Sequence, residues 1–126
     1  PTTHRAALWN AGHGPAYRIR ATDGAADRLI PTATPLGFPS VVLGGASPTM
    51  DLDAGDLLML GTDGVIEVSN GSGEMFGVER LLETIRQHCH EPAERIVAAV
   101  ADRVQRFHGL SAPPDDTTLV IIRRQS

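Results

Sequence analysis

Two kinds of apolar pattern divide this chain. Unbroken apolar runs occupy residues 57–60 and 119–122, whereas apolar residues between 77 and 107 recur at every third or fourth position. An unbroken run favours a strand covered on both faces, and the three-to-four spacing favours a helix with one buried face. We therefore predict a layered α+β fold, with 57–60 in the middle of a sheet and 117–123 as a second strand covered on both faces.

Two helices are predicted in the segment with helical spacing. The first covers 77–89 and the second begins near Pro92, which suits a first helical turn, and ends near Gly109. Each helix has apolar residues on one side only, so each must pack on a sheet or on the other helix. Their apolar stripes are Val78, Leu81, Leu82 and Ile85 in the first helix, and Ile96, Val97, Val100, Val104 and Phe107 in the second.

The N-terminal third has the pattern of short strands separated by turns. Residues 4–9 and 16–20 are predicted to pair as a hairpin around the glycine-rich turn 10–15. A further short strand is expected at 29–30, and 53–56 is predicted to be a tight turn into the strand at 57–60.

Composition narrows the class of protein. The 126 residues include 11 basic and 15 acidic residues without a block of like charge, which argues against a nucleic-acid surface or a polybasic membrane contact. No apolar stretch approaches the roughly 20 residues of a membrane span. Cys89 is the single cysteine and cannot form an internal disulfide, so a reducing cytoplasm is the expected location.

Acidic residues lie at the ends of both apolar runs. Asp63 comes three residues after the first apolar run, and Asp115 and Asp116 directly precede the strand predicted at 117–123. If these strands are antiparallel neighbours, the three carboxylates meet at one rim, where a shared cation would relieve their repulsion. Oxygen ligands favour Mg²⁺ or Mn²⁺, and Gly64 would allow close approach of the backbone to a ligand. The alternative is an Asp63-Gly64 turn and a solvated strand start.

Several short motifs occur in an order typical of one family. The chain resembles the C-terminal half of the PPM-type, metal-dependent protein serine/threonine phosphatases, in the branch of the stage II sporulation protein E and the RsbU-like regulators. The resemblance extends from about Trp9 to Ile122. The segments that carry it are Asn10-Ala11-Gly12-His13-Gly14-Pro15, Pro35-Leu36-Gly37, Gly55 to Glu67, Gly73 to Leu81, and Asp115-Asp116-Thr117-Thr118-Leu119.

The resemblance implies a fold, a reaction and a set of site residues. The fold would be an αββα sandwich of antiparallel sheets flanked by helices, which binds two or more Mn²⁺ or Mg²⁺ ions. Asp63 and Asp115 would be metal ligands, with Gly64 and Asp116 beside them, and His13 would be a candidate phosphate or substrate contact. The reaction would be hydrolysis of phosphoserine or phosphothreonine by a metal-activated water.

The family's other metal ligands lie in N-terminal motifs that residues 1–126 lack. We therefore expect these residues to be the C-terminal portion of a longer phosphatase domain. The expected partner is a phosphorylated bacterial regulatory protein, such as an anti-sigma-factor antagonist, with an upstream sensor domain and dimerisation in the full-length protein. The alternative is an inactive phosphatase remnant that acts as a protein-interaction module.

Overall fold

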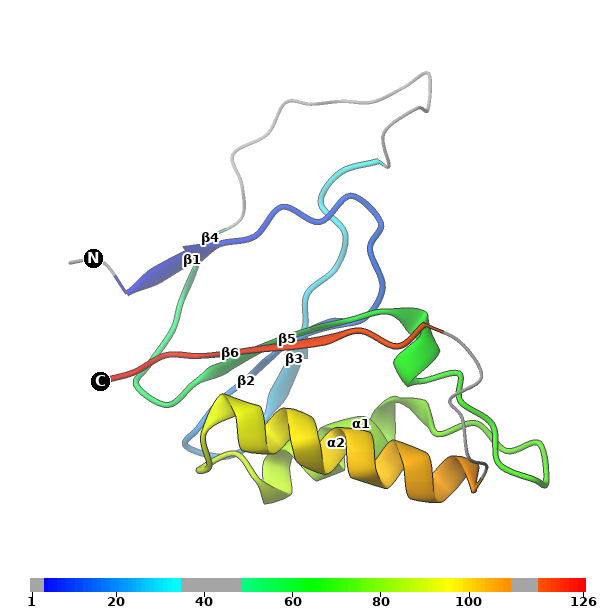
Figure 1. Cartoon of the computed structure of the whole chain (residues 1–126). Helices are drawn as coiled ribbons and strands as arrows, with labels where there is room; N and C mark the ends of the chain where they lie inside the picture. Colours follow the sequence, from blue (N-terminus) through cyan, green and yellow to red (C-terminus); the bar gives the residue numbers. More distant parts are fainter. Residues whose placement is uncertain (1–3, 35–48, 110–115) are drawn as a thin grey trace.

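The described part of the chain forms two antiparallel sheets and two α-helices. The structure, a computed structural model, describes residues 4–34, 49–109 and 116–126. A four-stranded sheet has the order β3-β2-β5-β6, and a separate two-stranded sheet pairs β1 with β4 (Figure 1). The strands are β1 (Arg5–Ala7), β2 (Ala16–Ile19), β3 (Ala26–Arg28), β4 (Thr49–Asp51), β5 (Leu57–Gly61) and β6 (Leu119–Arg123); the helices are α1 (Gly77–Gln87) and α2 (Ala93–His108).

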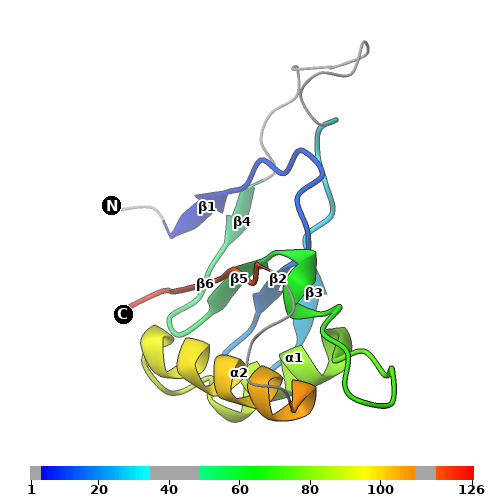
Figure 2. The same cartoon turned by 45° about the vertical axis from the view of Figure 1, so that its right-hand side comes forward.

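Both helices lie on one face of the four-stranded sheet, and the β1–β4 pair lies toward the other side (Figure 2). In the sheet, Tyr17, Met59 and Ile121 stand opposite one another, and all three belong to or pack against the hydrophobic core. The helices contribute residues such as Leu81 and Ile96, both fully buried. The predicted α+β class is confirmed, with a core between helices and sheet.

The helices follow the predicted pattern closely. The predicted apolar positions of α1 and α2 belong to or pack against the core, except the partly buried Val97, and Pro92 stands just before α2 in an extended conformation. Gly109 ends α2 with a φ of 72°, a left-handed conformation that glycine adopts without steric cost. No helix within the described ranges is long and apolar enough to cross a membrane.

The predicted hairpin of 4–9 with 16–20 is wrong. β1 pairs with β4, whereas β2 pairs with β3 on one side and with β5 on the other. Ile19, for example, stands between Ala26 and Leu57, so both edges of β2 are occupied and none is left for β1. The short strand expected at 29–30 lies a few residues earlier, at Ala26–Arg28.

β5 is central as predicted, but β6 is not covered on both faces. β6 is an edge strand of the sheet that the structure describes, and its burial alternates along the strand. Val120 is 44% exposed and Ile122 is 49% exposed. They stand opposite Leu60 and Leu58 of β5, on the sheet face away from the helices. An unbroken apolar run therefore marked a strand correctly but did not reveal that one face is open.

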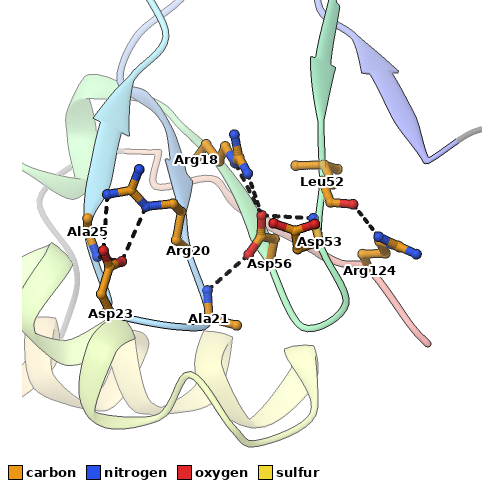
Figure 3. A network of polar contacts seen from close by, with 9 residues as sticks. All are labelled: Arg18, Arg20, Ala21, Asp23, Ala25, Leu52, Asp53, Asp56 and Arg124. Carbon is orange, nitrogen blue, oxygen red and sulfur yellow. Dashed lines mark hydrogen bonds and ion pairs between the residues drawn. The ribbon is translucent and has the colours of Figure 1, made fainter.

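The turn before β5 is organised by the buried carboxylate of Asp56, which is 1% exposed. Its oxygens accept hydrogen bonds from Arg18 Nε and Nη2 at 3.2 and 2.8 Å, and from the backbone N–H groups of Ala21 and Asp53, both at 3.0 Å (Figure 3). The backbone carbonyl of Asp56 also accepts a hydrogen bond from Arg124 N–H at 3.0 Å. One residue therefore connects β2, the 53–56 turn and the end of β6.

Burial alone would raise the pKa of the Asp56 carboxyl. The hydrogen bonds from Ala21 N–H, Arg18 and Asp53 N–H outweigh burial, so the pKa lies below its ordinary value of 3.8. A charged, fully hydrogen-bonded carboxylate is thus the stable form in the folded protein.

We expect Asp56→Asn to lower the free energy of unfolding by roughly 3 kcal/mol, because it leaves Arg18 without its buried counter-charge. The amide also places a donor where a second acceptor is needed. Urea unfolding monitored by circular dichroism measures the loss. Asp51→Asn is the matched control, since the Asp51–Arg5 pair is exposed, and it should change stability by less than about 1 kcal/mol. Equal losses in both variants would contradict the central role of Asp56.

The lowered pKa of the Asp56 carboxyl should make the stability of the protein depend on pH. Because the folded-state pKa of Asp56 is lowered, its stabilisation is fully present above the unfolded value near 3.8 and is lost as pH falls through the folded-state pKa. The stability difference between the wild-type protein and Asp56→Asn should therefore shrink as pH falls below about 4. Urea unfolding of both proteins from pH 7 to pH 3 tests this, and a difference that stays constant would contradict it.

Candidate functional site

The ends of β5 and β6 form one rim of the sheet, as the sequence predicted. Gly61 stands opposite Leu119 in the antiparallel register. Beyond it, Thr62 N–H donates to the Thr118 carbonyl at 3.0 Å, and Thr118 N–H donates to Thr62 Oγ1 at 3.0 Å. The chain leaving β5 and the chain entering β6 therefore run side by side, which brings the Asp63 and Asp116 positions to the same end.

Asp63 is the first residue of a short 3₁₀ helix, Asp63–Val65, directly after β5. Its carbonyl accepts hydrogen bonds from Ile66 N–H and Glu67 N–H, both at 2.9 Å, while Val65 at the end of the turn is fully buried. The side chain of Asp63 is exposed at the rim. The backbone is thus fixed, and the carboxylate is open to a ligand from solvent.

Gly64 lies against the chain that leads into β6. An ideal Cβ on Gly64 would be 2.6 Å from the carbonyl oxygen of Asp116 and 3.7 Å from Thr117 Oγ1. Real Cβ atoms are not found that close to a backbone oxygen, so the two segments can approach only because residue 64 has no side chain. Gly64 therefore allows a close approach to the backbone of Asp116, whereas its predicted close approach to a ligand stays a prediction.

A third segment, residues 14–15, lies at the same end of the sheet beside Gly61 and Asp63. An ideal Cβ on Gly14 would be 2.8 Å from the Gly61 carbonyl oxygen and 3.0 Å from Asp63 Oδ1. Pro15 contributes a carbonyl that accepts the Gly61 N–H at 2.9 Å. Sequence reasoning missed Gly14, because it paired β2 with β1 instead of β5. The signal that could have found it is the second glycine of the 10–15 turn, immediately before β2.

His13 precedes Gly14 and is exposed. Its backbone is held by Asn10, whose Oδ1 accepts the His13 N–H at 2.7 Å. His13 therefore lies next to Gly14, at the same end of the sheet as Asp63, on a turn whose backbone is hydrogen-bonded to Asn10. Its role as a phosphate or substrate contact stays a prediction.

The chemistry of the rim suits a hard divalent cation. Asp63 offers exposed carboxylate oxygens, and Gly14 and Gly64 let two other segments of the backbone, with their carbonyl oxygens, lie close to it. In residues 4–34, 49–109 and 116–126, no three His, Cys, Asp or Glu side chains form a metal-binding group. Asp115 and the Pro35-Leu36-Gly37 motif lie outside the described residues, so their predicted places are not tested.

Comparison with solved structures shows which fold this chain has part of. The chain is similar to the RsbU and RsbW domains of Rv1364c from Mycobacterium tuberculosis, with a TM-score of 0.76, 24% identity, and coverage of 98% of this chain and 33% of that one. It is also similar to the PP2C phosphatase domain and regulatory-domain fragment of SpoIIE from Bacillus subtilis, with a TM-score of 0.72, 18% identity, and coverage of 96% and 34%. The fold is therefore that of part of a PP2C-like domain.

The family follows from the sequence. The sequence profile described as Stage II sporulation protein E (SpoIIE) matches residues 1–125, and the chain belongs to this phosphatase family. Protein IcfG of Synechocystis sp. is 29% identical over 118 residues, which are 91% of this chain and 18% of IcfG. The chain thus spans less than a fifth of this curated relative and about a third of the two solved chains above.

We expect Gly64→Ala to destabilise the protein by about 1–3 kcal/mol, because the new methyl group must displace the Asp116 backbone. Gly71→Ala is the matched control, since an ideal Cβ at Gly71 meets no described atom within 4 Å and its φ is not positive. The free energy of unfolding of this control should lie within about 0.5 kcal/mol of the wild-type value. Urea unfolding of both variants measures the difference. A Gly64→Ala protein with the wild-type free energy of unfolding would show that the contact of Gly64 with the Asp116 backbone is not tight.

Proposed function

We propose that this chain supplies part of the active site of a Mn²⁺- or Mg²⁺-dependent protein serine/threonine phosphatase. The observation that carries the proposal is the convergence of three segments at one end of the sheet: Gly14 against Asp63, and Gly64 against Asp116. Membership of the SpoIIE family supports a phosphatase. Gly14 lies close to the exposed Asp63 carboxylate, and Gly64 brings the Asp116 segment beside the same turn, as expected where separate segments together build a ligand site.

The residues of the rim would have different roles in binding the ions and the substrate. Asp63 and Asp115 would hold the ions, and Asp116 would support them from just outside. When bound, the ions supply an activated water and neutralise charge on the phosphoryl oxygens. Thr62 and Thr118 keep the two acidic segments side by side through their reciprocal hydrogen bonds. His13 would contact the phosphate of the substrate from the neighbouring turn.

We further propose that residues 1–126 are the C-terminal portion of the phosphatase domain. The chain covers only part of each solved chain that it resembles. The half-exposed Val120 and Ile122 give the sheet an apolar face opposite the helices, where the second sheet of an αββα sandwich would pack. In this arrangement the remaining metal ligands would come from the part of the domain that precedes residue 1.

The proposed substrate is a phosphorylated bacterial regulatory protein, such as an anti-sigma-factor antagonist. The solved relatives support a regulatory setting, since one joins RsbU and RsbW domains in a single protein and another belongs to a cell fate determinant. An upstream sensor domain, dimerisation and a cytoplasmic location belong to the same proposal. The acidic balance of the chain, 15 acidic against 11 basic residues, gives no reason to propose a nucleic-acid partner.

We expect Asp63→Asn to abolish both Mn²⁺ binding and phosphopeptide hydrolysis in a protein extended upstream to the complete domain. The substitution keeps the size of the side chain but removes the negative charge that a divalent cation requires. Calorimetry with Mn²⁺ and phosphate release from a phosphoserine peptide measure the two losses. Residues 1–126 alone should bind Mn²⁺ much more weakly than the extended protein, because they hold only part of the ligand set.

Asp27→Asn is the matched control, because Asp27 is exposed on β3 and the change in charge is the same. It should bind Mn²⁺ and hydrolyse the peptide like the wild-type protein. An extended protein that ignores Mn²⁺, or an Asp63→Asn variant that retains binding and turnover, would overturn the enzyme proposal. The protein-interaction module would then take its place.

A further inference from the structure

We infer that Asn10 is a positioning residue for Asp63, acting through the turn that carries His13 and Gly14. This inference rests on the proposed function and deepens it. Asn10 is a polar residue in a loop, yet it is only 5% exposed. A buried amide in a loop must have its hydrogen bonds satisfied by specific partners, so the identity of these partners shows what the residue holds in place.

The side chain of Asn10 binds the backbone of one residue, His13, with both ends of its amide. Oδ1 accepts the His13 N–H at 2.7 Å, and Nδ2 donates to the His13 carbonyl at 3.4 Å. The short bond is typical of asparagine in turns, where the side chain replaces a backbone acceptor. The conformation of the chain from Asn10 to His13 is therefore set by this one amide.

The backbone of Asn10 is fixed to a different segment. Its N–H donates to Thr32 Oγ1 at 3.2 Å, and its carbonyl accepts hydrogen bonds from Thr32 N–H at 2.8 Å and Ala33 N–H at 3.1 Å. Residues 32 and 33 lie just after β3, which pairs with β2. Asn10 is thus hydrogen-bonded through its backbone to residues 32 and 33, and through its side chain to the backbone of His13.

The turn places Gly14 beside Asp63. An ideal Cβ on Gly14 would be 3.0 Å from Asp63 Oδ1 and 3.3 Å from Asp63 N, and the next residue, Pro15, accepts the Gly61 N–H at 2.9 Å. The Gly14 backbone therefore bounds the space on one side of the Asp63 carboxylate. A turn that relaxed by even about 1 Å would give this carboxylate more freedom, which metal coordination and catalysis tolerate poorly.

The experiment compares three variants of Asn10 and its neighbours in the full-length protein that contains this chain. Asn10→Ala removes both side-chain bonds to His13. Asn10→Ser keeps a weaker acceptor for the His13 N–H and adds no charge. Thr32→Val is the control, because it removes the acceptor of the Asn10 N–H on the side of Asn10 that does not face the turn. Each protein is measured for its Mn²⁺ dissociation constant by calorimetry, its kcat and KM for a phosphoserine peptide, and its Tm.

We expect Asn10→Ala to weaken Mn²⁺ binding by about 10–100-fold, the usual effect of losing a residue that orients a metal ligand. The value of kcat should fall with it, and Asn10→Ser should recover part of both losses. Thr32→Val should lower Tm while the folded protein keeps the Mn²⁺ affinity of the wild type.

Different outcomes overturn different parts of the argument. A wild-type protein that neither binds Mn²⁺ nor hydrolyses the peptide removes the proposed function and this inference together. A wild-type protein that does both, with an Asn10→Ala variant that matches it in Mn²⁺ affinity, overturns the inference alone. Equal losses of affinity in Asn10→Ala and Thr32→Val also overturn it, since they show a general effect on stability. If Asn10→Ala does not fold, Gly14→Ala decides, because its methyl group acts directly at Asp63 and unchanged Mn²⁺ affinity there would reject the inference.

Discussion

The register of β5 against β6 is the constraint on which the rest of the structure depends. Side chains alternate between the two faces of a strand, so a slip of one residue would turn Met59 and its neighbours away from the helices. The same slip would move the acidic segment before β6 out of line with Asp63. Core and candidate site therefore require the same pairing, although they lie at different places along the strands.

Polar groups secure this register at both ends. At one end, the Asp56 carbonyl accepts the Arg124 N–H, and its buried carboxylate holds Arg18 and the turn before β5. At the other end, Thr62 and Thr118 exchange their two hydrogen bonds. Apolar packing between sheet and helices opposes a slip of one residue, and the paired polar groups oppose a slip of any length, because each slip would break their hydrogen bonds. The buried carboxylate far from the site thus helps to define the geometry at the site.

The sequence predicted those features that depend on local pattern. The helices, the central place of β5, the 53–56 turn and the meeting of Asp63 with the segment before β6 all follow from periodicity, glycine and proline positions, and the alternation of buried and polar segments. The partners of β1 and β2 could not be found this way, because strand pairing depends on contacts between residues that are distant in the chain. Gly14 was missed for the same reason. Its importance is visible only when β2 lies beside β5.

The half-exposed outer face of β6 connects the fold to the proposed complete domain. Full burial of an aliphatic side chain contributes roughly 1.5–3 kcal/mol, and Val120 and Ile122 are each about half exposed, so covering both would add roughly 1.5–3 kcal/mol in all. Exposed apolar residues side by side on an edge strand also invite pairing with other chains. Both costs disappear if a second sheet packs on this face. The same packing would bring further ligands toward the rim at Asp63, because that rim lies at the end of the strands whose face would be covered. Completing the core and completing the site would then be one event.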